Sequence, residues 1–127
     1  MKKIIYFLVI IAVVFGLYKL LSIPPKNNIS NYDNPDLIFY WGEGCPHCKN
    51  VEKWVKDNNA NQKLKINQKE IYKNIQNQKE MTDLVKQYCS DLVGQNGIGI
   101  PLGFDPVNKK CISGDQPIID FLSSKIK

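Results

Sequence analysis

The chain has 127 residues, a length typical of one domain, and its 43% hydrophobic and 23% charged residues exclude a disordered or collagen-like protein. The net charge of +5 lies mostly in residues 1–26, which hold four lysines and no acid, whereas residues 27–127 hold 13 lysines and 12 carboxylates, a net +1. Because the chain has no arginine, the residue best suited to bind phosphate and guanine, we expect no nucleic-acid partner.

An apolar segment opens the chain. From Ile4 to Ile23 the sequence holds one charge, that of Lys19, and a helix of about twenty residues spans the ~30 Å hydrocarbon core of a bilayer. We expect residues 1–23 to be a single-pass anchor in the lipid bilayer of the cytoplasmic membrane, with the domain on the extracytoplasmic side because lysines gather at the amino end. A cleaved signal peptide is the alternative, although no small-residue cleavage site follows. Residues 24–34, rich in proline and asparagine, predict a polar linker.

The remaining residues, 35–127, predict one domain with the element order β-α-β-α-β-β-α. We expect Asp115 to cap the last helix. Because strands joined through helices run parallel and a terminal hairpin runs antiparallel, this order predicts an α/β fold with a mixed sheet flanked by helices. Apolar periodicity and turn residues place the strands at Leu37–Trp41, Leu64–Ile66, Ile100–Phe104 and Lys110–Ser113, and the first two helices at Cys45–Asn58 and Ile71–Leu92.

A Cys-Pro-His-Cys motif lies where the first predicted strand ends and a helix begins. A helix N-terminus offers unpaired N–H groups and a partial positive charge, and both stabilise a thiolate. Pro46 is tolerated in a first turn, and His47 adds a donor or a positive charge near Cys45. Such a pair exchanges disulfides: Cys45 forms the mixed disulfide and Cys48 resolves it. A stabilised thiolate favours the oxidant direction.

A zinc site is the alternative interpretation of this motif, because C-P-x-C is also half of a common zinc knuckle. The other two cysteines, Cys89 and Cys111, are twenty-two residues apart on a predicted helix and a predicted strand, so they do not supply the second half. We therefore expect no metal, and no cofactor beyond the redox disulfide of Cys45 and Cys48 itself. Cys89 and Cys111 form either a structural disulfide or two separate buried thiols, and the sequence leaves both open.

The arrangement resembles the thioredoxin superfamily: a buried strand leads into Cys45-Pro46-His47-Cys48, a helix follows, and Gly99-Ile100-Pro101 opens a late strand. The resemblance covers the chain from Asp36 onward. The compact element order is closest to glutaredoxin-like members, and Pro-His between the cysteines resembles disulfide oxidases of the DsbA type.

The resemblance implies roles for individual residues. Cys45 would be the nucleophile and Cys48 the resolving cysteine, with Pro101 a cis-proline that faces them. Ile100 and Trp41 would contact the substrate, and the free backbone of Ile100 would pair with a substrate strand. An ordinary trans proline at the start of a strand is the alternative for Pro101.

These observations predict an enzyme, a thiol–disulfide oxidoreductase acting on protein thiols and disulfides and recycled by a membrane or soluble redox partner. Thioredoxins have a buried aspartate that takes part in proton transfer, and the first predicted strand here has no acidic residue to match it. Glu43 lies nearby, but we expect it to be a solvated loop carboxylate. A non-enzymatic module that binds Zn or Cu(I) through the same cysteines is an alternative function, and a tethered interaction domain is another.

Overall fold

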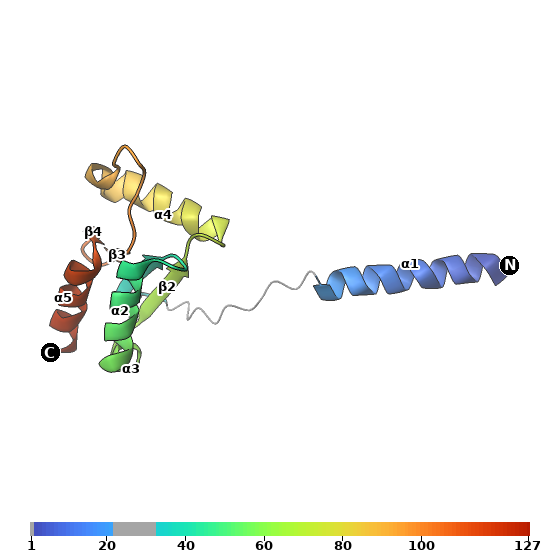
Figure 1. The fold of residues 1–127 in the computed structure, drawn as a ribbon, viewed down its shortest axis with the longest axis horizontal. Coiled ribbons are helices and arrows are strands. Elements are labelled where there is room, and N and C mark those ends of the chain that lie inside the picture. Colours follow the sequence, from blue (N-terminus) through green and yellow to red (C-terminus); the bar gives the residue numbers. More distant parts are fainter. Residues whose placement is uncertain (1, 22–32) are drawn as a thin grey trace.

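The computed structural model describes residues 2–21 and 33–127, so most of the predicted linker, residues 24–34, lies outside the described residues (Figure 1). The predicted order β-α-β-α-β-β-α is confirmed, with the short helices α3 and η1 added. The elements in chain order are α1 (Lys2–Leu21), β1 (Leu37–Trp41), α2 (Pro46–Asp57), α3 (Ala60–Lys63), β2 (Ile66–Glu70), α4 (Ile75–Tyr88), the 3₁₀ helix η1 (Ser90–Leu92), β3 (Leu102–Asp105), β4 (Lys110–Ser113) and α5 (Asp115–Ile126).

The four strands form one mixed sheet in the order β2-β1-β3-β4, as an α/β fold with a terminal hairpin predicts. β1 runs parallel to β2, with Leu37 opposite Ile66, and antiparallel to β3, with Tyr40 opposite Leu102. β3 and β4 form the antiparallel hairpin. β1 is therefore an inner strand of the sheet. Its carboxyl end, which leads into the Cys-Pro-His-Cys motif, lies between the ends of β2 and β3.

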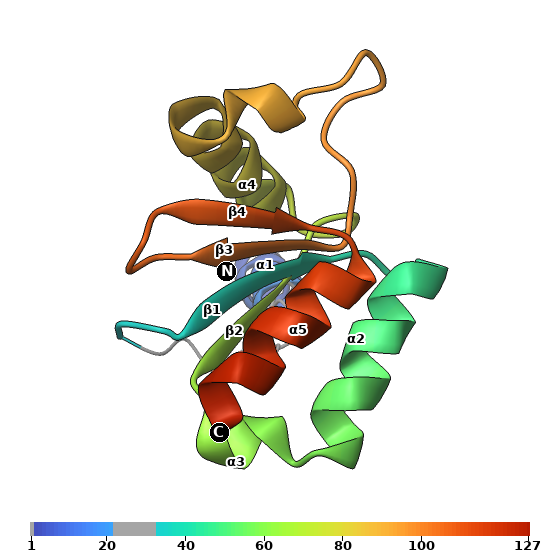
Figure 2. The ribbon, with the colours of Figure 1, turned by 90° about the vertical axis from the view of Figure 1, so that its left-hand side faces the viewer.

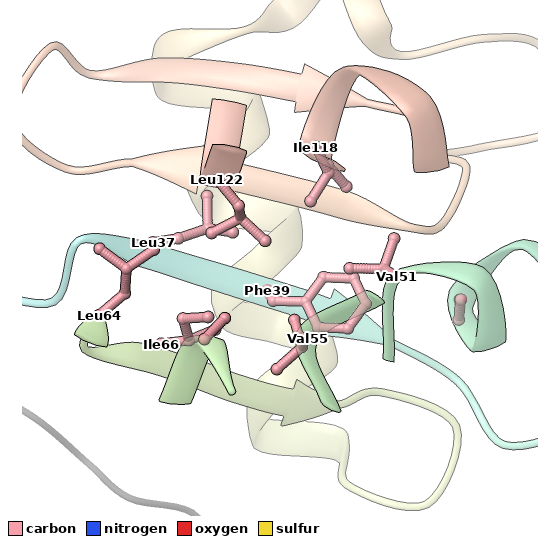
Figure 3. Close-up of a cluster of buried hydrophobic side chains, with 10 residues drawn as sticks. Leu37, Phe39, Val51, Val55, Leu64, Ile66, Ile118 and Leu122 are labelled. Carbon is pink, nitrogen blue, oxygen red and sulfur yellow. The ribbon is translucent and has the colours of Figure 1, made fainter. Parts of the chain in front are cut away.

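Helices cover both faces of the sheet because β1 is apolar on both of its sides. Leu37 and Phe39 point to the face covered by α2, α3 and α5, whereas Tyr40 points to the face covered by α4. Figure 2 shows α2 and α5 side by side across the first face, with α4 away from them. Figure 3 shows the core of that first face, which includes Leu37, Phe39, Val51, Val55, Leu64, Ile66, Ile118 and Leu122.

Tyr40 on β1 forms a hydrogen bond with α4. Its ring is fully buried, and its hydroxyl donates to Oε1 of Glu80 on α4 over 2.8 Å. Burial, together with the hydrogen bond and the charge of Glu80, raises the pKa of Tyr40, so the phenol stays protonated and remains a donor. Lys69 on β2 reaches the same carboxylate over 2.6 Å.

Three predicted elements have bounds that are wrong by a few residues, and the second predicted helix also ends early, at Tyr88, before the separate 3₁₀ helix η1. The strand expected at Leu64–Ile66 is Ile66–Glu70, because Leu64 ends the short helix α3. The second predicted helix begins at Ile75 rather than Ile71, since the side chain of Asn74 caps it by accepting from the N–H groups of the second and third helical residues. The predicted strand Ile100–Phe104 starts two residues later, after Pro101.

The N-terminal helix α1 lies within the segment predicted as a membrane anchor. Its side chains from Ile4 to Tyr18, the span without a charge, are exposed. Within residues 2–21 and 33–127, no helix is both long and apolar enough to cross a membrane, so the prediction of a transmembrane anchor over residues 1–23 is not supported.

Candidate active site

The Cys-Pro-His-Cys motif lies at the N-terminus of α2, as predicted, and its two cysteines form a disulfide with Cα atoms 5.3 Å apart. Cys45 is the N-cap residue, and the N–H of Cys48 donates to its Sγ over 3.2 Å. Pro46 is the first helical residue, where a missing N–H leaves no partner unpaired. Cys45 is partly exposed, whereas Cys48 is 1% exposed and belongs to the core. An incoming sulfur therefore reaches Cys45 and not Cys48.

His47 contacts Asp115, which we expected from the sequence to cap the last helix. Its Nδ1 lies 3.2 Å from Oδ2 of Asp115, and Nδ2 of Asn50 donates to the same oxygen over 2.6 Å. We expected Asp115 to cap α5, but Gly114 occupies the N-cap position and Asp115 is the first helical residue. Its carboxylate reaches across to the first turns of α2 instead. The hydrogen bonds from Asn50 and then from His47 lower the pKa of Asp115 to about 2.

Trp41 and the Ile100–Pro101 segment, which we expect to contact the substrate, lie where β1 ends and β3 begins. The peptide bond between Ile100 and Pro101 is cis, and Pro101 is buried. The last residue pair between β1 and β3 is Tyr40 with Leu102, so Pro101 follows opposite Trp41, where β1 leads toward Cys45.

Three side chains from the end of β1 and its neighbouring loops pack against the same core cluster. Trp41, Cys45 and Ile100 all pack against the core cluster on the face covered by α2 and α5. The buried indole N–H of Trp41 has no hydrogen-bond partner among the described residues. Trp41, Cys45 and Ile100 thus pack against one core cluster, and the strand register places Pro101 opposite Trp41.

Glu70, which the sequence did not single out, joins two loops beside this site. Its carboxylate accepts from the backbone N–H of Tyr72 over 2.9 Å, of Lys73 over 2.7 Å and of Glu43 over 3.4 Å. Burial raises the pKa of Glu70, but these backbone hydrogen bonds and the charge of Lys73 outweigh it, so the net pKa is lowered. The exposed side chain of Glu43 forms an ion pair with Lys73. Glu70 is a single acidic residue at the end of a polar strand and belongs to no motif or periodic pattern, so sequence analysis does not identify it.

Replacing Glu70 by glutamine is expected to lower the free energy of unfolding by about 1–2 kcal/mol at neutral pH, because an amide oxygen accepts the three N–H groups less strongly than a carboxylate. A lowered pKa means that the carboxylate stabilises the fold above its ordinary pKa of 4.5 and that this contribution is lost as the pH falls through its folded value. Denaturant titrations from pH 3 to pH 7 should show the two proteins converging in acid.

The matched control for this experiment is Glu52→Gln. Glu52 lies on α2, and its side chain takes part in no hydrogen bond or ion pair within the described chain, so its replacement should leave stability unchanged. A Glu70→Gln protein as stable as wild type at pH 7, or one whose deficit does not shrink as the pH falls from 7 to 3, would contradict the role given to Glu70.

The second cysteine pair, for which the sequence left two alternatives open, forms a disulfide. The Cα atoms of Cys89 and Cys111 lie 6.1 Å apart, and the bond joins the end of α4 to β4. Cys89 is 5% exposed and Cys111 is partly buried, so this disulfide, like that of Cys45 and Cys48, joins one buried cysteine to one partly buried cysteine. Unlike the Cys45–Cys48 disulfide, it does not lie at the N-terminus of a helix of eight or more residues, and it links two elements that are distant in the sequence, as a structural cross-link does.

The described residues give the metal-site alternative no support. No group of three or more His, Cys, Asp or Glu side chains is arranged to hold a metal ion within residues 2–21 and 33–127. Comparisons with protein-family models, curated proteins and solved structures found no match. Any function must therefore be argued from the chemistry of the site.

Proposed function

We propose that the protein is a thiol–disulfide oxidoreductase of thioredoxin-like fold that exchanges disulfides with protein thiols through Cys45 and Cys48. The observation that carries the proposal is a disulfide at a helix N-terminus with one accessible sulfur and one buried sulfur. The four-stranded mixed sheet, with helices on both faces, is compatible with the thioredoxin-like fold.

In the oxidant direction, a substrate thiolate attacks Sγ of Cys45, the bond between Cys45 and Cys48 breaks, and Cys48 leaves as a thiolate. A second substrate thiolate then attacks the substrate sulfur of the mixed disulfide and expels Cys45. The substrate gains a disulfide and loses two electrons, which remain on the reduced cysteine pair. A partner disulfide, on a protein or in glutathione, takes up these electrons and restores the pair.

Two features of the site support this chemistry. The N–H of Cys48, already directed at Sγ of Cys45, would stabilise the thiolate that leaves in the second step. The backbone N–H and carbonyl groups of Ile100 make no hydrogen bond with any described residue, so they are free to pair with an extended substrate peptide.

We also propose that the domain works in an oxidising compartment on the extracytoplasmic side. The Cys89–Cys111 disulfide supports this location, because cytoplasmic thiol systems keep such pairs reduced. Fractionation of cells, with the mass of the isolated protein, should find the domain outside the cytoplasm and show whether residues 1–23 are retained or removed.

The reduction potential of the Cys45–Cys48 pair, measured in glutathione buffers, tests the function. We expect a reversible two-electron couple, and catalysis of disulfide formation in a reduced model substrate. A potential near −120 mV would support the oxidant direction, whereas a value near −270 mV would show a reductant. Exchange no faster than the uncatalysed rate would overturn the proposal, and metal retained through purification would favour the alternative metal-binding function.

A further inference from the structure

We propose that Asp115 is a positioning residue that binds Nδ1 of His47, withholds this donor from Cys45 and so makes the Cys45–Cys48 disulfide a weaker oxidant than its Pro-His sequence implies. The inference rests on the proposed function, since it concerns the redox equilibrium of that same pair. It assigns a regulating role to a residue on the last helix of the chain, 70 positions after Cys45.

The contacts that carry the inference link α5 to α2. His47 and Asn50 are three residues apart on α2, so their side chains leave the helix on the same side. Both reach Oδ2 of Asp115, over 3.2 Å and 2.6 Å respectively. The Asp115 side chain is 27% exposed and that of His47 is 70% exposed, so the carboxylate is the more fixed of the two partners.

The charge state of Asp115 determines which of the two side chains carries the proton in their hydrogen bond. With its pKa lowered to about 2, the carboxylate is ionised at neutral pH. An ionised carboxylate has acceptors alone, so the proton between the two side chains belongs to Nδ1 of His47. That donor is then committed to Asp115, and His47 cannot offer it to Cys45.

The expected sign follows from the difference between the two redox states. Reduction creates an anionic sulfur at Cys45, whereas the disulfide carries no charge. Asp115 adds a second anion next to the first turn of α2 and withdraws a donor from the new thiolate, so it destabilises the reduced state selectively. A less stable reduced state makes the disulfide a weaker oxidant.

The test is the redox equilibrium of Asp115→Asn, in which oxidised protein and two glutathione molecules form reduced protein and glutathione disulfide. We expect the equilibrium constant to rise at least threefold, and the thiolate absorbance of Cys45 to appear at lower pH than in wild type. Asp120→Asn is the matched control: it removes one charge from the same helix, but Asp120 accepts from Gln116 and does not contact His47. Thermal melts should show that both variants remain folded.

A His47→Ala background separates positioning from charge. If Asp115 acts through His47, Asp115→Asn should shift the equilibrium there by less than half as much as in wild type. An equal shift in both backgrounds, or an equilibrium in Asp115→Asn that matches the Asp120→Asn control, would overturn the inference while leaving the proposed function intact. A wild-type protein with no reversible equilibrium would instead overturn the proposed function, and the inference with it.

Discussion

Replacing Cys45 by alanine is expected to abolish disulfide exchange, whereas replacing Cys48 is expected to trap the protein in a mixed disulfide with its substrate. The difference follows from access: Cys45 is partly exposed at the helix N-terminus, and Cys48 is 1% exposed. Without Cys45 no accessible sulfur remains in the pair, and the rate should fall about 10³-fold or more, as when other enzymes lose their nucleophile. Without Cys48 the thiolate of Cys45 still attacks a substrate disulfide and releases one substrate thiolate, but no second thiol in the protein resolves the mixed disulfide.

The measurement compares wild type, Cys45→Ala and Cys48→Ala, each in the reduced form and mixed with a substrate that carries one internal disulfide, with non-reducing gels and intact mass to detect the mixed disulfide. Cys48→Ala should gain the mass of one substrate molecule and lose it on reduction, and Cys45→Ala should not. Each variant serves as the control for the other because both remove the same disulfide. Equal behaviour of the two variants would contradict the assigned roles.

Removing the Cys89–Cys111 disulfide with a double alanine variant is expected to lower the free energy of unfolding by about 3 kcal/mol. The bond closes a loop of 22 residues, and the chain-entropy relation gives about this value for a loop of that length. For a domain of this size the melting temperature should fall by about 12 °C or more. Denaturant titration and thermal melts without reductant measure both quantities.

The Cys45→Ala, Cys48→Ala double variant is the matched control for this experiment. Each disulfide joins one buried cysteine to one partly buried cysteine, so the cost of lost side-chain packing is similar in the two variants. The cysteines of the first disulfide are three residues apart, and the same relation gives about half the stabilisation. An equal or smaller loss on removing Cys89–Cys111 would show that this bond is not the main covalent support of the domain.

Local patterns were sufficient for the central strand and for the site at its end. Leu37–Trp41 holds five successive apolar residues, which suits a strand buried on both faces, and β1 has these bounds. The cysteine spacing and Pro46 placed the start of α2 correctly. In both cases the residues that decide the structure are neighbours in the sequence.

Long-range contacts decided what local patterns could not show. β2 has polar residues at Asn67, Gln68 and Lys69, and it is a strand because it pairs with β1 rather than through its own pattern. An aspartate at the start of a helix usually indicates a cap, yet Asp115 binds side chains 65 and 68 residues away. No sequence spacing records such a contact, which depends on how α5 packs beside α2.

The central place of β1 in the sheet affects the order in which the domain assembles. β1 is the first strand of the chain, yet Ile38 pairs with Phe104, 66 residues later, and its inner face is closed by Ile118 and Leu122 from the last helix. Such distant pairings raise the contact order and slow folding relative to a helical bundle. A growing chain therefore exposes Cys45 and Cys48 to oxidation before β3, β4 and α5 have been made, whereas Cys89 can pair with Cys111 only once β4 has been made.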